Sequence, residues 1–336
     1  MKEKVIIFLL LVLFYKLASK SIDDIQMIGQ AKHLQKKVMN NSMCNTAIKQ
    51  PNHQKKRRKT ALKFGHRGAS FSAPENTIAA CKKAFELGAD GIEIDIHMTA
   101  DKKIIVLHDN TLKRVATYTQ GLQEKTGINT EQFAKIVNTV VSELKYATIK
   151  HIDVGLWKGE DWAGEKIPTL HELLPIVLIS SKPSKKIQIE IKEKSHAIIP
   201  ELKRVLEKYP KSSLAESVIL IGFDLEMMRR VKKEISYCHT LLIRDTSTYE
   251  SIEKMLEANL DGITFEANPQ LLTKEIVEEL HQRKKIVGVW VFCKQDTQDN
   301  LAYFEELGVD FQTTNLPPDV VEAIAKVAST ELDSSF

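Results

Sequence analysis

Hydrophobic and polar residues change their spacing repeatedly from residue 61 onward. Short apolar runs such as 218–222 and 286–291 alternate with longer segments such as 225–235 and 274–283, in which apolar residues recur every three or four positions. The first pattern is typical of buried strands and the second of amphipathic helices. Repeated through residues 61–330, this alternation predicts an α/β fold, a TIM-type (β/α)8 barrel. An open doubly wound sheet is the alternative, but the sequence has no GxGxxG or Walker-type loop to support it.

The predicted elements follow one another with a single long interruption. Strands are expected at 61–65, 91–97, 104–107, 187–191, 218–222, 240–243, 262–264, 286–291 and 310–313. Helices are expected at 75–87, 170–180, 197–209, 225–235, 249–258, 274–283, 299–307 and 318–327. The polar stretch 110–168, with one helical segment around 131–144, is read as an insertion after the second and third strands. Long insertions at one end of a barrel are usually functional, so we expect a lid or a specificity element there.

The first 60 residues have a different character. Lys2 and Lys4 precede an apolar run from Val5 to Tyr15, which is shorter than the roughly 20 residues of a spanning helix. Residues 1–19 are therefore interpreted as a signal peptide or signal anchor, which predicts a secreted, periplasmic or membrane-anchored lumenal protein. Residues 20–60 are rich in Lys, Gln, Asn and Ser and are expected to be a disordered linker. Three interpretations of its basic block, 55–59, remain open: a solvated tether, a contact for anionic lipid, or a nuclear localisation signal. The last is excluded if residues 1–19 act as a signal peptide.

Charge and cysteine content narrow the function further. The net charge is +4, and the basic block 55–59 accounts for it, so the remainder of the chain is close to neutral. This balance argues against nucleic acid as a partner. The four cysteines show no CxxC spacing, and we expect Cys81, Cys238 and Cys293 to be buried and free.

Two carboxylates one residue apart give the first indication of chemistry. In the strand 91–96, apolar and acidic residues alternate, so Glu93 and Asp95 should project from one face. Like charges placed about 7 Å apart repel each other unless a positive charge lies between them. A divalent cation bound by carboxylate oxygens satisfies this requirement, and such hard ligands favour Ca²⁺ or Mg²⁺ over Zn²⁺.

Further polar residues are expected at the ends of other strands. His66 and Arg67 end the first strand, His108 ends the third, Glu190 and Lys192 belong to the strand near residue 190, and Trp290 lies near a late strand end. A single histidine or tryptophan at such a place is more often a packing residue, so the prediction depends on their convergence at the carboxyl end of a barrel. This set of residues is suited to cleaving a phosphodiester. Carboxylates would bind a metal, the arginine and lysine would bind the phosphate, and the two histidines would act as acid and base.

Six short motifs carry a resemblance to a known family. In order they are His66-Arg67-Gly68, Pro74-Glu75-Asn76-Thr77, Glu93-Ile94-Asp95, His108-Asp109, Ile167-Pro168-Thr169-Leu170 and Ile189-Glu190-Ile191-Lys192. From about Lys63 to Asp319, the chain resembles the glycerophosphodiester phosphodiesterase family. The resemblance implies a TIM-type barrel with a segment inserted after the His-Asp motif, and one divalent cation, usually Ca²⁺ or Mg²⁺. By position it implies metal ligands at Glu93, Asp95 and Glu190, an acid–base pair at His66 and His108, and phosphate-binding cations at Arg67 and Lys192.

The expected reaction is hydrolysis of a small-molecule glycerophosphodiester to glycerol 3-phosphate and an alcohol. The chain departs from the family's pattern at Gly222-Phe223, where a serine–phenylalanine pair is usual, and at Asn315, where an aspartate is common. Two alternatives remain open: a lysophospholipase D or sphingomyelinase D-like enzyme on lipids, which the amino-terminal segment would bring to a membrane surface, and a catalytically silent binding barrel. Trp290 is a possible pocket residue in each case.

Overall fold

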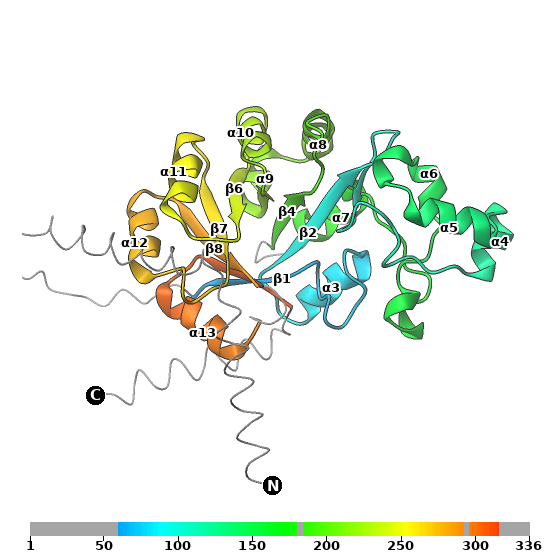
Figure 1. Cartoon of the computed structure of the whole chain (residues 1–336), viewed down its shortest axis with the longest axis horizontal. Coiled ribbons are helices and arrows are strands. Elements are labelled where there is room, and N and C mark those ends of the chain that lie inside the picture. Colours follow the sequence, from blue (N-terminus) through cyan, green and yellow to red (C-terminus); the bar gives the residue numbers. More distant parts are fainter. Residues whose placement is uncertain (1–59, 180–184, 292–295, 316–336) are drawn as a thin grey trace, which may run out of the picture. The chain divides into compact units, whose positions relative to one another are not determined.

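Hydrogen bonds between neighbouring strands run around a complete ring. Figure 1 shows the strands of this ring with helices around them. The computed structural model describes residues 60–179, 185–291 and 296–315. The strand order is β1-β9-β8-β7-β6-β5-β4-β2, all pairings are parallel, and β2 pairs with β1 to close the ring. The strands are β1 (Leu62–Gly65), β2 (Gly91–Met98), β4 (Lys186–Ile191), β5 (Val218–Gly222), β6 (His239–Arg244), β7 (Gly262–Glu266), β8 (Ile286–Trp290) and β9 (Phe311–Thr314). The predicted (β/α)8 barrel is thereby confirmed.

Helices cover the outside of this ring. They are α3 (Ile78–Glu86), α7 (Leu170–Leu178), α8 (Ile198–Leu206), α9 (Lys211–Ser217), α10 (Leu225–Glu234), α11 (Tyr249–Glu257), α12 (Lys274–Gln282) and α13 (Gln298–Leu307). Side-chain caps fix several of their first turns. The Thr77 hydroxyl accepts the N–H of Ala80, so α3 begins at Ile78 and not at the predicted residue 75. The sequence reading also missed α9, whose polar residues show little apolar spacing.

Two apolar layers follow from the alternation of side chains along the strands. Phe64, Ile219, Leu241, Ile243 and Phe311 point inward and fill the centre of the barrel. Their strand neighbours point outward and pack against the helices, where they form the largest hydrophobic cluster of the molecule. The polar site described below lies above the inner layer, at the carboxyl ends of the strands.

The insertion leaves the ring through an antiparallel strand. Strand β3 (Ile104–Val106) pairs with the far end of β2, and the chain then forms α4 (Gln120–Thr126), α5 (Thr130–Asn138) and α6 (Tyr146–Ile149) beside the barrel (Figure 1). Short 3-10 turns lie at Val141–Glu143, Leu156–Lys158 and Glu160–Trp162. The insertion has its own buried cluster, which includes Leu112, Leu122, Val141 and Ile152. The helix predicted around 131–144 ends earlier, because the β-branched run from Thr139 to Val141 adopts extended backbone at Thr139 and Val140.

Several predictions lie outside the described residues: the segments 1–19 and 20–59, the helix 318–327, Cys44 and Cys293. Within the described ranges, Cys81 and Cys238 are buried and free, as expected. None of the helices in those ranges combines the length and the apolar character needed to cross a membrane.

Candidate active site

The predicted site residues gather around one cavity of about 580 Å³ at the carboxyl ends of the strands. Its lining comes from the barrel strands, from the loops that follow them and from the insertion: His66, Arg67, Ser70, Glu75, Glu93, His108, Arg114, Trp157, Lys158, Gln188, Glu190, Lys192, Ile221, Phe223, Ile243, Thr264, Trp290, Val291, Thr313 and Asn315. Of the eight residues singled out from the sequence, only Asp95 is absent from this lining, and it is buried beside Glu93 and Glu190. The structure therefore brings all eight together.

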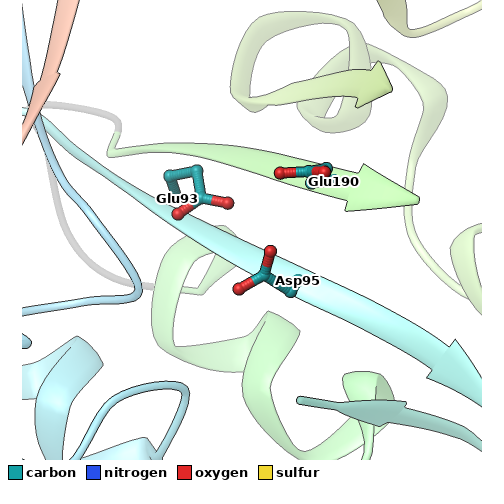
Figure 2. A group of neighbouring side chains, drawn as sticks. All are labelled: Glu93, Asp95 and Glu190. Carbon is teal, nitrogen blue, oxygen red and sulfur yellow. The ribbon is translucent and has the colours of Figure 1, made fainter. Parts of the chain in front are cut away.

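Three carboxylates form the centre of the site (Figure 2). Glu93 and Asp95 come from the same face of β2, and Glu190 comes from β4, where it is the register partner of Asp95. One oxygen of each lies within 4.8 Å of one oxygen of the others, and all three side chains are buried. Figure 2 shows the carboxylate groups turned toward one another. Such crowding of buried anions is expensive unless a cation compensates it.

The acid–base properties of this cluster reflect that cost. Burial, reinforced by the charges of Asp95 and Glu190, raises the pKa of Glu93 well above its usual value. Burial and the charge of Asp95 likewise raise the pKa of Glu190 to about 7, although Lys192 opposes the shift. The Lys192 ammonium lies 2.9 Å from Glu190 Oε1 and 3.6 Å from Asp95 Oδ1. The donor set of three hard carboxylate oxygens therefore fits a divalent cation such as Ca²⁺ or Mg²⁺.

Arg67 is held against this cluster in a strained backbone conformation. Its φ of 55° lies in the left-handed region, which costs a non-glycine residue on the order of 1–3 kcal/mol. Its backbone N–H donates to Glu93 Oε2 at 3.0 Å, and its Nη1 donates to Glu75 Oε1 at 2.9 Å. The buried Nε makes no hydrogen bond within the described structure, and its nearest acid is Asp95 Oδ2 at 3.6 Å. That N–H is free to bind a ligand oxygen.

His66 is oriented by Asn315, which follows β9. Asn315 donates from its Nδ2 to Asp296 at 3.1 Å, so its Oδ1 faces His66 Nδ1 at 2.8 Å. An amide oxygen can only accept, so Nδ1 carries the proton and Nε2 is left with a lone pair. Burial, together with the charge of Arg67, lowers the pKa of His66. The imidazole is therefore neutral near pH 7 and can accept a proton at Nε2.

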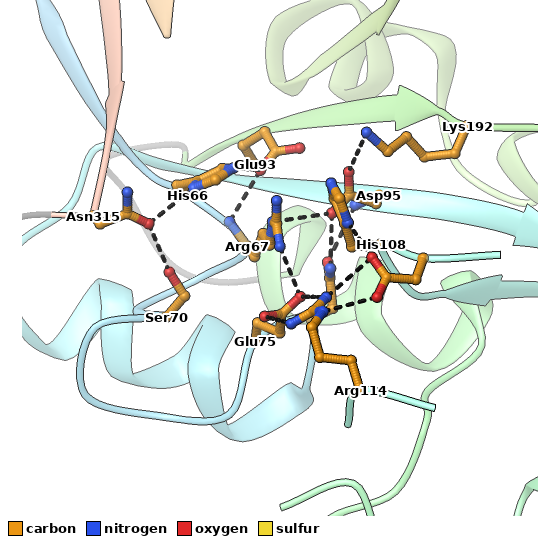
Figure 3. A network of polar contacts seen from close by, with 12 residues as sticks. His66, Arg67, Ser70, Glu75, Glu93, Asp95, His108, Arg114, Lys192 and Asn315 are labelled. Carbon is orange, nitrogen blue, oxygen red and sulfur yellow. Dashed lines mark hydrogen bonds and ion pairs between the residues drawn. The ribbon is translucent and has the colours of Figure 1, made fainter. Parts of the chain in front are cut away.

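His108 is connected to Arg67 through a chain of polar contacts (Figure 3). Its Nδ1 donates to Asp109 Oδ1 at 2.6 Å, and Arg114 from the insertion donates to both oxygens of Asp109. The same guanidinium donates to both oxygens of Glu75, at 2.6 and 2.8 Å, and Glu75 in turn binds Arg67. Hydrogen bonds from Arg114 and His108 outweigh partial burial and lower the pKa of Asp109 to about 2. Arg114 thus joins the partner of His108 to the partner of Arg67.

Sequence reasoning assigned no role to several of these supporting residues. Asn76 donates to Asp95 Oδ2 at 2.8 Å and accepts the N–H of Asp95 at 3.1 Å, which fixes that carboxylate. Glu75 and Asn76 belong to a motif that the sequence had identified, so that motif was the available signal. Arg114 and Asp296 gave none, because each has a partner that is remote in the sequence: Glu75 is 39 positions from Arg114, and Asn315 is 19 positions from Asp296.

One wall of the cavity is apolar. Ile221, Ile243 and Val291 line it together with Phe223 and Trp290, whose rings meet edge to face at 6.1 Å. The Trp290 indole donates to the carbonyl of Arg244 at 3.4 Å. The site therefore combines an ionic floor, formed by the carboxylate cluster with Arg67 and Lys192, with an apolar wall that includes Trp290.

Comparison with known proteins agrees with this geometry. The sequence model of the Glycerophosphoryl diester phosphodiesterase family matches residues 66–317, about three quarters of the chain. The chain belongs to this family. It is therefore an enzyme, a glycerophosphodiester phosphodiesterase within the phosphoric diester hydrolases. The glycerophosphodiester phosphodiesterase of Caldanaerobacter subterraneus subsp. tengcongensis is 31% identical over 268 residues, which cover 79% of this chain and 98% of that protein.

Solved structures of the family share the fold. A phosphodiesterase of Oleispira antarctica, solved with the product sn-glycerol-3-phosphate, superposes with a TM-score of 0.65 at 19% identity. The match covers 79% of this chain and 97% of that one. A glycerophosphodiester phosphodiesterase of Agrobacterium tumefaciens gives a TM-score of 0.61 at 22% identity, over 78% of this chain and 99% of that one. At these identities the likeness establishes the barrel.

Proposed function

We propose that this member of the family hydrolyses soluble glycerophosphodiesters to glycerol 3-phosphate and an alcohol, with a divalent cation, Ca²⁺ or Mg²⁺, as cofactor. The observation that carries the proposal is the buried cluster of Glu93, Asp95 and Glu190, set within an open cavity beside Arg67 and two histidines. The glycerol 3-phosphate bound to the Oleispira phosphodiesterase supports the choice of product.

The three carboxylates would hold the cation. When bound, it supplies positive charge that neutralises the phosphodiester oxygens. Arg67 binds the same phosphoryl group through its free Nε–H, because this N–H is buried and has no hydrogen-bond acceptor of its own. Lys192 adds a second positive charge from the opposite side of Asp95. Fixed donors of this kind stabilise charge that develops in the transition state without reorganising.

Two histidines divide the proton transfers. His66 accepts the proton of the attacking group at Nε2, because Asn315 fixes the Nδ1–H tautomer and burial keeps the ring neutral. The attacking group is water or the neighbouring glycerol hydroxyl, the latter giving a cyclic phosphate that water then opens. His108 protonates the departing alcohol from Nε2, while its Nδ1–H stays bound to ionised Asp109.

The decisive experiment is release of glycerol 3-phosphate from glycerophosphocholine by the full-length protein, with Ca²⁺, with Mg²⁺ and with EDTA. We expect release only with a metal, and loss of turnover by at least about 10²-fold in His66→Ala and in His108→Ala. His281→Ala is the matched control, since His281 lies outside the cavity and pairs with Asp310. Full activity in EDTA, or in both catalytic variants, would refute the mechanism.

The apolar wall favours one second candidate, cleavage of lysophospholipids as a lysophospholipase D. Phe223 and Trp290 offer apolar surface beside the ionic floor, as a glycerol carrying an acyl chain would require. Comparing kcat/KM for glycerophosphocholine and lysophosphatidylcholine decides between the two substrates.

A further inference from the structure

Large apolar side chains reach solvent at very few places in the described residues, and most of those places lie on one face of the barrel. Five such side chains are exposed: Phe71, Trp157, Ile179, Phe223 and Tyr249. Scattered single apolar residues on a surface need no explanation, whereas a group of them at one site does.

Four of the five lie on the face of the barrel where the active site opens. Phe223 directly follows β5, and Phe71 lies in the loop between β1 and α3. Tyr249 is the first residue of α11, which begins where the chain leaves β6. Trp157, from the insertion, lines the cavity together with Phe223. We call Phe71, Trp157, Phe223 and Tyr249 the aromatic rim; their exposed fractions run from 39% to 64%.

Ile179 is the exception and lies on the opposite face. It ends α7, which leads into β4, so it sits at the end of the barrel where the strands begin. Its exposed fraction is 72%, more than that of any rim residue. Exposure alone therefore does not distinguish the rim, but its position around the cavity mouth does.

Polar contacts hold the segments that carry three of the four rim residues, Phe71, Trp157 and Phe223. The Lys158 ammonium donates to the carbonyl of Ser70 at 2.8 Å and lies 5.7 Å from the centre of the Trp157 ring, which ties the insertion to the loop carrying Phe71. The Arg244 guanidinium donates to the carbonyl of Phe223 at 2.6 Å. These contacts hold the backbone next to Phe71 and at Phe223, and place Lys158 against the Trp157 ring, so these segments need little reordering to bind a surface.

Charges next to the rim have both signs. Lys158 is followed by Glu160 and Asp161, while Arg244 stands between Asp224 and Asp245, whose charges act on it. No uniform positive field therefore surrounds the cavity mouth, as an anionic membrane would require. Tryptophan, tyrosine and phenylalanine with neighbouring charged groups suit the boundary between head groups and acyl chains.

We propose that the aromatic rim seats the open end of the barrel on a zwitterionic lipid surface of the phosphatidylcholine type. The apolar segment 5–15, if it is retained as an anchor, would keep the chain at such a surface. The 44 residues from 16 to 59 could extend to about 150 Å, long enough for either end of the barrel to face the membrane. This inference does not depend on which diester is cleaved.

Tryptophan fluorescence of the full-length protein tests the contact directly. Vesicles of phosphatidylcholine brominated in the acyl chains quench only tryptophans that reach the lipid. We expect quenching that disappears in Trp157→Phe, since Trp157 is the exposed rim tryptophan. No quenching, although the protein sediments with the vesicles, would mean that the amino-terminal segment alone holds the chain and would overturn the proposal.

Matched variants separate the rim from general hydrophobicity. Phe71→Ser/Tyr249→Ser should raise the lipid concentration for half-maximal quenching about tenfold or more, because two aromatic contacts are lost. Ile179→Ser, which removes a still more exposed apolar side chain from the other face, should leave it unchanged. Equal effects of both variants would overturn the proposal.

Two further measurements test which lipid head group the rim prefers and whether the rim variant keeps its fold. Replacing a third of the lipid by phosphatidylserine should not strengthen the quenching, and stronger, salt-sensitive quenching would contradict the zwitterionic assignment. Hydrolysis of soluble glycerophosphocholine should be equal in wild type and in Phe71→Ser/Tyr249→Ser, since neither residue lines the cavity. An equal loss of soluble activity and of quenching would mean that the variant disturbs the fold and would leave no support for a docking role.

Discussion

At the scale of single residues, Arg114 connects the two halves of the proposed catalytic network. It binds Glu75, the partner of Arg67, and Asp109, the partner of His108. We expect Arg114→Met to lower kcat about 10- to 100-fold, since residues that orient catalytic groups typically contribute this much. Lys113→Met changes an exposed neighbouring cation and should leave kcat unchanged. Steady-state kinetics on glycerophosphocholine compares the two, and wild-type kcat in Arg114→Met would refute the role.

Asn315 permits a second test at this scale. Asn315→Leu removes the acceptor that fixes the Nδ1–H tautomer of His66, so we expect kcat to fall about 10- to 100-fold with little change in KM. Ser70→Ala removes the other donor to Asn315 Oδ1 but no contact to His66, and it should lower kcat much less. Equal losses in the two variants would contradict a role through the tautomer.

Residue-scale prediction from the sequence worked where motifs were short and local. The motifs identified Glu93, Asp95 and Glu190 because acids alternate with isoleucines along single strands. They assigned no role to Asp296, whose contact with Asn315 joins two loops and has no periodic spacing. Such side-chain contacts between loops depend on the closed fold, so the sequence offers no local signal for them.

At the scale of single elements, a strand and a helix should differ in how they tolerate replacement of a glycine by alanine. Gly288 in β8 faces the barrel centre, and a Cβ there would stand 2.0 Å from the Phe311 ring. Gly288→Ala should therefore lower the free energy of unfolding by about 1–3 kcal/mol, as overpacking does. Gly121→Ala in α4 meets no atom within 4 Å and should stabilise the helix by about 0.5–1 kcal/mol. Urea unfolding of both variants measures the difference, and a neutral Gly288→Ala would contradict the packing described here.

Element prediction succeeded for most strands of the barrel and failed mainly at boundaries and in the insertion. The run of apolar residues predicted β5 with its observed bounds, Val218–Gly222, because that strand is buried on both sides. The start of α3 was misplaced because the Thr77 cap, and not hydrophobicity, decides it. The short helices α4 and α6 pack on a small core of their own, and their spacing is too brief to predict a helix.

For the whole molecule, the buried acids make the stability of the metal-free protein depend on pH. Folding raises the pKa of Glu93 and Glu190, so these two carboxyl groups bind more protons in the folded state than in the unfolded state from pH 4.5 up to about 7. Burial lowers the pKa of His66 and His97, which opposes this effect below pH 6.5. In EDTA the Tm should therefore rise as the pH is lowered from 8 to 6.5, before the histidines of the unfolded chain take up protons, and saturating Ca²⁺ or Mg²⁺ should raise Tm most at pH 8. Glu190→Gln should flatten the EDTA curve. A Tm in EDTA that falls over this range would contradict the charge balance of the cluster.

We expect the separate core of the insertion to set the temperature at which the heated enzyme loses activity. Because this core shares no cluster with the barrel, the insertion can unfold in a sub-global opening while the barrel persists. Every such opening withdraws Arg114 and Trp157 from the cavity. Thermal inactivation should therefore begin below the temperature at which circular dichroism detects loss of the barrel, with full activity returning on cooling. On this prediction, the insertion, and not the larger barrel, sets the upper working temperature of the enzyme.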